Sequence, residues 1–283
     1  MLRTRDKILL ARALRFPIVL FSRIRHKGTL QTVTRRGIKW SLDLDEGIDL
    51  SIYVFGCFEP KTTRALQKLI APGDIVIDIG ANIGAHTLGM AKLVGAAGRV
   101  IAFEPTRFAH AKLLRNLELN TSLAVRVTVE QIFLTDQPTS PAPGTVYSSW
   151  PLNRTNELHA KHRGAAEDTT GASAKTLDDY VLTHSIERVG LIKLDVDGHE
   201  CQVLRGADQV LKSHRPIILM ELAPYTLCEA GDSVEELLRI LAEAGYSLLY
   251  ETSRRSLPSE AHQVKTMFED GASINVVAKP RRC

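Results

Sequence analysis

The sequence predicts an α/β protein with a mainly parallel sheet that is covered by helices on both faces. Two observations predict this fold class. From residue 74 onward, short apolar segments alternate with segments of helical periodicity, which is typical of strand–helix–strand units. The first apolar segment, 74–79, leads directly into a glycine-bearing turn at 78–84 and then into a helix, as in open sheets that bind ligands at their strand ends.

The predicted elements follow one another with little interruption. Strands are expected at 74–79, 99–103, 124–129, 190–196, 216–222, 247–250 and 274–278. Helices are expected at 60–70, 85–94, 107–120, 177–183, 200–212 and 233–244.

Individual residues support these boundaries. Pro60 lies near a helix start, where its missing amide has no helical partner to lose. Gly95 and Gly98 end the helix at 85–94. The strand at 274–278 follows a long connection without an obvious crossover helix, so it can be antiparallel. The helix at 233–244 has one apolar stripe, formed by Val234, Leu237, Leu238 and Leu241.

The chain divides into three parts. Residues 1–35 form a basic N-terminal arm. Residues 36–71 form a lead-in, in which strands are expected before the helix because apolar and polar residues alternate from 40 to 53. Residues 72–283 form the α/β domain. Within it, residues 137–174 are rich in Pro, Ser, Thr, Gly and Ala, and are expected to be a long irregular loop, a possible substrate lid.

The N-terminal arm carries the positive charge of the chain. Residues 1–27 contain eight Lys and Arg residues and one acidic residue, a net charge of +7, which leaves −3 for the rest. Three interpretations stay open: a basic helix packed on the core, peripheral contact with an anionic membrane, or an organelle transit segment. No apolar run is long enough to span a bilayer.

The four cysteines are scattered along the chain. This spacing argues against a zinc knuckle and against a disulfide framework. A reducing, cytoplasmic compartment is therefore predicted. The cysteines are Cys57, Cys201, Cys228 and Cys283.

The turn at 78–84 predicts a ligand site, because Gly80 and Gly84 let the backbone approach a bound molecule. A dinucleotide-binding turn has a middle glycine, and this chain has Asn82 there. Asp78 would also repel a pyrophosphate. Both features disfavour NAD and favour a cationic ligand without phosphate, such as S-adenosylmethionine.

Glu104 follows the second strand of the domain at the same edge of the sheet. A carboxylate there can accept hydrogen bonds from both ribose hydroxyls of a nucleoside. The alternative is a carboxylate that caps the following helix. Together, the turn and Glu104 predict the binding site of the cofactor.

A second group of polar residues ends the strand at 190–196. Asp195 is predicted to hold the methionine end of the cofactor or a substrate hydroxyl, and it is also a candidate for the catalytic base. Asp197 or His199 is predicted to take a proton from an attacking alcohol. Glu200 is expected to orient the turn or cap the next helix.

Glu221 ends the next strand at the same edge, where it can pair with Lys193 or bind substrate. Acidic residues and a histidine at these positions can also hold Mg²⁺. A metal is not favoured, because the spacing matches no dedicated metal site.

The loop at 137–174 contains groups suited to a hydroxylated substrate, and Trp150 and Asn153 are the candidates from it. An insertion without a role in binding is the alternative. Other polar and aromatic residues of the loop are Tyr147, Arg154, Asn156, His159 and His162.

On these motifs the chain resembles the FkbM-type methyltransferases, which are class I S-adenosylmethionine-dependent enzymes. The resemblance implies a seven-stranded Rossmann-like sheet and methyl transfer, commonly to a hydroxyl oxygen. It also implies that Glu59 and Thr62 close over the methionine end of the cofactor. The motifs lie at 56–60, 72–84, 102–105, 176–180 and 192–200.

The chain departs from the family pattern at one position of the last motif. The family usually has Glu-Gly-Ala-Glu where residues 197–200 read Asp-Gly-His-Glu. His199 is therefore either a catalytic residue of this chain or a variant neighbour of the site.

These observations predict an O-methyltransferase that acts on a sugar, a glycan or another hydroxylated small molecule, and not on nucleic acid. The alternatives are an N-methyltransferase or nucleic-acid methyltransferase, an NAD-dependent oxidoreductase, and a cofactor-binding scaffold without activity. The turn at 195–198 lacks the Asn/Asp-Pro-Pro-aromatic element common in base methylation.

Overall fold

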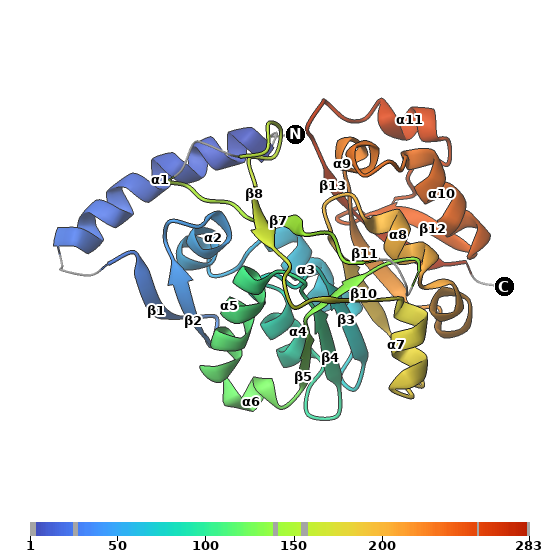
Figure 1. The fold of residues 1–283 in the computed structure, drawn as a ribbon, viewed down its shortest axis with the longest axis horizontal. Helices are drawn as coiled ribbons and strands as arrows, with labels where there is room; N and C mark the ends of the chain where they lie inside the picture. Colours follow the sequence, from blue (N-terminus) through green and yellow to red (C-terminus); the bar gives the residue numbers. More distant parts are fainter. Residues whose placement is uncertain (1–3, 25–27, 138–140, 154–157, 254, 282–283) are drawn as a thin grey trace.

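The computed structural model describes residues 4–24, 28–137, 141–153, 158–253 and 255–281. A seven-stranded sheet forms its centre (Figure 1). In spatial order the strands are β12 (Tyr246–Tyr250), β13 (Ile274–Pro280), β11 (Ile217–Leu222), β10 (Leu191–Leu194), β3 (Ile75–Ile79), β4 (Arg99–Phe103) and β5 (Val127–Glu130).

Strands β11, β10, β3, β4 and β5 are parallel to one another, and β13 is antiparallel to both of its neighbours. The predicted α/β class and mainly parallel sheet are therefore confirmed, and the closing strand is antiparallel. The third predicted strand begins later than expected, at Val127, because Thr121–Ala124 form a short helix, α6.

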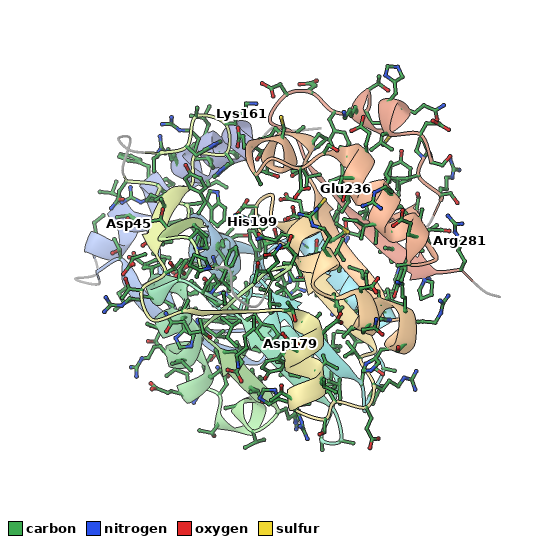
Figure 2. All side chains as sticks on the ribbon, turned by 45° about the vertical axis from the view of Figure 1, so that its right-hand side comes forward. Asp45, Lys161, Asp179, His199, Glu236 and Arg281 are labelled. Atoms are coloured by element: carbon green, nitrogen blue, oxygen red, sulfur yellow. The ribbon has the colours of Figure 1, made fainter. Side chains whose placement is uncertain are left out.

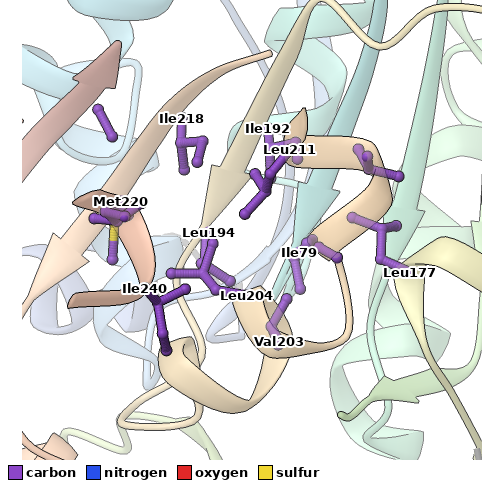
Figure 3. Packing of buried hydrophobic residues seen from close by; sticks show 14 of the residues in the cluster. Ile79, Leu177, Ile192, Leu194, Val203, Leu204, Leu211, Ile218, Met220 and Ile240 are labelled. Atoms are coloured by element: carbon purple, nitrogen blue, oxygen red, sulfur yellow. The ribbon is translucent and has the colours of Figure 1, made fainter. Parts of the chain in front are cut away.

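One face of the sheet packs against helices from the second half of the chain. Successive strand residues point to opposite faces, so Ile77 and Ile79 contribute to this face while Val76 contributes to the other. Figure 3 shows Ile79 and Leu194 among side chains of the covering helices. These helices are α7 (Leu177–Thr183), α8 (Glu200–Arg205), the π-helical turn η1 (Val210–His214) and α10 (Val234–Glu243).

The other face packs against helices from the first half of the chain, with a hairpin over their outer side. The helices are α2 (Gly47–Phe55), α3 (Pro60–Leu69), α4 (Thr87–Leu93) and α5 (Arg107–Glu118), and the hairpin is β1 (Leu30–Arg35) with β2 (Ile38–Asp43). The C-terminal half of the chain also contains the short helices α9 (Pro224–Glu229) and α11 (Ala261–Lys265).

The lead-in differs from the prediction at residues 47–55, which form a helix instead of a strand. Ile48 and Ile52 are four residues apart, so they lie on the same side of a helix and both are buried against the core. Alternation over so short a segment is compatible with either structure. Packing against the core decided between them.

The segment at 137–174 is also more regular than predicted. It contains the antiparallel pair β7 (Thr145–Ser149) and β8 (Ala165–Asp168), and β9 (Ser173–Lys175) pairs with β6 (Ile132–Leu134). Trp150 and Leu152 make backbone hydrogen bonds to Gly47 and Asp45 of the lead-in. Such distant partners leave no local periodicity in the sequence. Arg154 and Asn156 lie outside the described residues.

Helix α1 (Thr4–Ile24) lies along the outer edge of the molecule over α2 (Figure 1). Its buried residues, Ile8 and Val19, pack with Leu44, Leu50 and Leu152. The Arg15 guanidinium bonds the Asp45 carboxylate, with Nε to Oδ1 at 2.7 Å. Among the described residues, no helix is both long and apolar enough to cross a membrane.

Candidate active site

A cavity of about 1270 Å³ lies at the carboxyl ends of the parallel strands. Gly80, Glu104, Asp195 and Glu221 line it, and they come from the ends of β3, β4, β10 and β11 respectively. Ligand pockets in proteins commonly have about 300–1,000 Å³. The cavity is therefore large enough for a nucleoside cofactor together with a second small molecule.

The glycine turn after β3 is held against the neighbouring strands. The amides of Gly80 and Ala81 both donate to the carbonyl of Phe103 at 3.0 Å. A Cβ on Gly80 would lie 1.8 Å from the carbonyl oxygen of Asp195, and Gly80 has a φ of +76°. Glycine at this position therefore permits close approach between the ends of β3 and β10.

Gly84 has a packing role as well. A Cβ there would lie 2.5 Å from Leu113 and 2.6 Å from Leu88, so this glycine brings the turn against α5 and α4. Of the predicted turn residues, Gly80 and Asn82 line the cavity, whereas Gly84 lies behind the wall.

Asp78 is fully buried behind the same wall. It accepts a hydrogen bond from Thr87 Oγ1 at 2.6 Å, and its Oδ1 lies 3.6 Å from Lys193 Nζ. This carboxylate, which we predicted in the cofactor site, is thus placed to hold the start of α4 and the buried lysine. Asp78 does not line the cavity, so the prediction of direct contact with the cofactor is not met by this placement.

Lys193 connects the ends of two strands. Its Nζ lies 3.3 Å from Asp195 Oδ2 and donates to the carbonyl of Gly80 at 3.1 Å. Burial alone lowers the pKa of Lys193, but the charges of Asp195 and Asp78 outweigh burial and raise that pKa above its ordinary value. Lys193 therefore stays charged and keeps the Asp195 carboxylate in place.

Glu104 is buried and accepts hydrogen bonds from several groups. The amides of Asn82 and Thr106 donate at 2.9 and 3.0 Å, and the hydroxyls of Thr106 and Ser148 at 2.6 and 3.3 Å. Burial raises the pKa of Glu104, and these hydrogen bonds lower it in part. The cap of α5 is Thr106, whose hydroxyl accepts from the amide of Ala109. The alternative role of Glu104 as the helix cap is therefore wrong.

Ser148 is a site residue that we did not predict. Its carbonyl and hydroxyl accept hydrogen bonds from Asn82 Nδ2 at 2.7 and 3.1 Å, and its hydroxyl also contacts Glu104. This serine joins β7 to the glycine turn. Only the return of residues 145–149 to the strand ends brings it there, so no local pattern identifies it.

Glu59 and Thr62, which the resemblance implies at the methionine end of the cofactor, both line the cavity. Asn275 Nδ2 donates to Thr62 Oγ1 at 2.7 Å and lies 3.3 Å from Glu59 Oε2. Glu59 has a φ of +43°, a conformation that costs about 1–3 kcal/mol for most residues and is concentrated at functional sites. Asn275 comes from β13, next to Glu221 in the register, and was not predicted.

The charges around the cavity fit S-adenosylmethionine, whose sulfonium and ammonium groups are cationic. Glu59, Glu104, Asp195 and Glu221 surround the strand ends, and the nearby Lys193 is already paired with carboxylates. Glu104 would hold the ribose, and Glu59 with Asp195 the ammonium group. A pyrophosphate would meet an excess of negative charge in this cavity.

The turn after β10 brings Asp197 into the cavity wall. Asp197 has a φ of +48°, and a Cβ on the following Gly198 would lie 2.3 Å from the carbonyl oxygen of Thr226. Glu200 lies behind the turn, where its Oε1 accepts from the amide of Val196 at 3.2 Å. Burial raises the pKa of Glu200 to about 7. The turn is therefore tightly constrained, with Glu200 in an orienting position.

Asp197 and Glu221 have pKa values well above those of ordinary carboxyl groups. Burial is the main cause for both, and the charge of Asp195 adds to it. Glu221 also accepts a hydrogen bond from Ser273 Oγ at 2.6 Å. Carboxyl groups with raised pKa values in a cavity are candidates for proton transfer.

His199 lines the same part of the cavity, and Figure 2 shows it near the centre of the molecule. Its Nδ1 lies 3.2 Å from Gln202 Oε1, and Gln202 Nε2 donates to Thr135 Oγ1 at 3.0 Å. A carboxamide oxygen only accepts, so Nδ1 carries the proton and Nε2 keeps its lone pair. Burial lowers the pKa of His199, which keeps the ring neutral and able to accept a proton.

Aromatic rings line another part of the cavity and form a wall there. His162 lies edge-on to Tyr147, with ring centroids 4.7 Å apart, and stacks on His159 at 3.9 Å. The predicted Trp150 belongs to this wall. The predicted Asn153 does not, because it is exposed and donates to Asp45 Oδ2 at 2.9 Å. We call Tyr147, Trp150, His162 and Tyr225, all of which line the cavity, the aromatic wall.

The cavity region also contains a cysteine, and the possibility of a metal site was raised above. Cys201 is fully buried, and burial raises the pKa of its thiol to about 12, as expected of a packing residue and not of a nucleophile. Within the described part of the chain, no three His, Cys, Asp or Glu side chains are grouped so as to hold a metal ion.

Known methyltransferases are similar to this chain in sequence. The chain is 27% identical over 188 residues to methyltransferase 1 of Beauveria bassiana. This alignment covers 62% of this chain and 73% of the relative. It is 24% identical over 189 residues to the hexuronic acid methyltransferase AglP of Haloferax volcanii, covering 67% and 70%. It is 28% identical over 221 residues to the 31-O-demethyl-FK506 methyltransferase FkbM of Streptomyces tacrolimicus, covering 69% and 81%.

Among solved structures, the methyltransferase FkbM of Methylobacillus flagellatus aligns with a TM-score of 0.42 and 17% identity, covering 77% of this chain and 50% of that one. A family model for the methyltransferase FkbM domain matches residues 78–248, which is more than half of the chain and includes the glycine turn, Glu104 and the turn after β10. With this match and the seven-stranded sheet expected of such enzymes, the chain belongs to the FkbM family of S-adenosylmethionine-dependent methyltransferases.

Proposed function

We propose that this enzyme methylates a hydroxyl oxygen of a neutral sugar or a similar hydroxylated small molecule. The observation that carries the proposal is the pairing of two different walls in one cavity. The strand ends present carboxylates and a neutral imidazole, and the aromatic wall lines the same cavity. Sugars match this combination, since their C–H faces pack on aromatic rings and their hydroxyls donate to carboxylates.

The residues of the chain have separate tasks in this reaction. When bound, S-adenosylmethionine supplies an activated methyl group. Glu104 holds the ribose, Glu59 and Asp195 hold the ammonium group, and the walls exclude water. His199 Nε2 or the Asp197 carboxylate accepts the proton that the acceptor hydroxyl loses as its oxygen forms the new bond to carbon. Positioning of the hydroxyl provides most of the rate.

The choice of a neutral acceptor follows from the charge of the cavity. The relative from Haloferax volcanii is named for a hexuronic acid, a sugar that carries a carboxylate. In this chain Asp197 and Glu221 line the cavity, and burial together with the charge of Asp195 raises the pKa of both. The same burial and charge would disfavour a carboxylate on the acceptor, and likewise the phosphates of nucleic acid. We also propose that no metal is needed, so EDTA should leave turnover unchanged.

The test combines cofactor binding with acceptor screening. Calorimetry should show binding of S-adenosylmethionine and no binding of NAD. Labelled S-adenosylmethionine should then transfer its label to neutral glycosides and less to the matching hexuronic acids. Transfer to amines or nucleic acid only, with none to any hydroxyl compound, would overturn the proposal.

A further inference from the structure

The outward side of α1 is apolar wherever its side chains are described. Of its described side chains, those that are exposed are all apolar. Isolated exposed apolar residues are normal on protein surfaces, but a continuous apolar helix face in water requires a partner. The residues are Leu9, Leu10, Ala13, Leu14, Phe16, Pro17, Leu20 and Ile24, and we call them the outer face of α1.

The other side of the helix is already occupied. Ile8 and Val19 are buried against the body, and Arg15 bonds Asp45. At 3.6 residues per turn, the outer face points away from these contacts. Phe16 is 70% exposed and Leu20 50%, so the body of the protein does not cover them.

This outer face continues into the mouth of the cavity. Leu10 and Leu14 belong to the outer face and also line the cavity. Val54 and Phe55 of α2, which are 39% and 56% exposed, extend the same apolar surface on the cavity rim. A partner that covers the outer face therefore also borders the entrance through which an acceptor arrives.

The charge of the arm identifies the partner. Residues 1–27 have a net charge of +7, while the rest of the chain has −3. Helices that combine an apolar face with basic residues lie in the interface of anionic membranes, where both features are satisfied.

We propose that α1 docks the enzyme on an anionic lipid surface, with the cavity mouth at the bilayer, so that the acceptor hydroxyl is carried by a lipid-linked molecule. The lipid-linked acceptor rests on the proposed hydroxyl methylation, whereas the docking of α1 does not. Docking brings a membrane-bound acceptor to the entrance between α1 and α2 without extraction of its lipid chain into water.

Vesicle flotation of the full chain tests the docking. The protein should float with vesicles of phosphatidylcholine and phosphatidylglycerol, and not with phosphatidylcholine alone, and high salt should release it. The double variant Phe16→Ser/Leu20→Ser should lower the partition coefficient at least tenfold. The matched control Val125→Ser/Leu182→Ser removes two apolar residues that are 83% and 79% exposed elsewhere, and should change nothing.

Several outcomes would overturn the docking. If both double variants float equally well, the outer face is not the surface that contacts the membrane. If the protein floats equally well with neutral and anionic vesicles, the basic arm does not contribute to docking. A dimer in sedimentation that dissociates in Phe16→Ser/Leu20→Ser would assign the face to a second copy of the chain. Should that variant fold poorly by circular dichroism, the lipid and salt dependence of the unaltered protein still decides.

Two readouts separate this proposal from the proposed function. Calorimetric affinity for S-adenosylmethionine should be unchanged in both double variants. A lipid-linked glycoside in anionic vesicles should have at least a tenfold lower KM than the free glycoside, and Phe16→Ser/Leu20→Ser should remove this advantage. Docking without that advantage would refute the lipid-linked acceptor alone, whereas absence of hydroxyl methylation on every acceptor would refute the proposed function.

Discussion

The strand-end side of the cavity and the aromatic wall differ in how their side chains are held. Glu104 accepts four hydrogen bonds, and Lys193 is fixed by two carboxylates and a carbonyl. Trp150 and Tyr147 are held mainly by ring contacts and by a segment that bonds the lead-in through a few backbone groups. The strand-end side is therefore held by more charged and hydrogen-bonding contacts than the rings of the aromatic wall.

The largest expected effect is on catalysis, at the junction of the two sides. Asp197→Asn and His199→Ala each remove one candidate base. The variant that lacks the true base should have a kcat lower by about 10²–10⁴-fold. Affinity for S-adenosylmethionine, measured by calorimetry, should change little. The exposed His262→Ala serves as a control. If neither variant lowers kcat, proton transfer belongs to another group or to water.

The next effect tests how rigid the strand-end side is. In Gly80→Ala the new Cβ would overlap the Asp195 carbonyl, so the free energy of unfolding should fall by about 2–4 kcal/mol through overpacking and a strained φ. Gly73 has a φ of +91° but nothing within 4 Å of a Cβ. Gly73→Ala should therefore cost only about 1 kcal/mol, from φ alone. Denaturant unfolding measures both, and equal losses would contradict the close approach.

Cofactor affinity provides a more local test of the same side. Glu104→Ala should weaken S-adenosylmethionine binding by about 1–3 kcal/mol, because ribose hydroxyls lose their acceptor. Glu118→Ala on the exposed end of α5 is the control, since this carboxylate lies on the surface. Isothermal calorimetry compares the two. An unchanged affinity in Glu104→Ala would remove this residue from the cofactor site.

The smallest expected effect lies on the aromatic wall. Trp150→Ala should raise the KM for a sugar acceptor by about fivefold, which corresponds to about 1 kcal/mol of lost ring packing. Asn153→Ala, three residues away but outside the cavity, should leave KM unchanged. Steady-state kinetics at saturating S-adenosylmethionine measures both. A loss of cofactor affinity in Trp150→Ala would contradict the division of the cavity into two sides.

The parts of the site that were predictable are those at the ends of parallel strands. Asn82, Glu104 and Asp195 each follow an apolar strand within a few residues, and parallel strands bring such ends to one edge. The direction of a side chain at that edge was not predictable. Asp78 and Gly84 belong to the same turn but lie behind the wall, because neighbouring helices and Lys193 occupy the space around them.

By itself, the sequence determined the parallel sheet, the glycine turn, the acidic strand ends and the basic arm, because each depends on residues close together in the chain. Only the tertiary structure decided that residues 47–55 are helical, that Ser148 joins Glu104, and that Asn275 joins Glu59. It also decided that the exposed side of α1 is apolar and continues into the cavity. These features depend on contacts between distant segments, and such contacts leave no periodicity or spacing in the sequence.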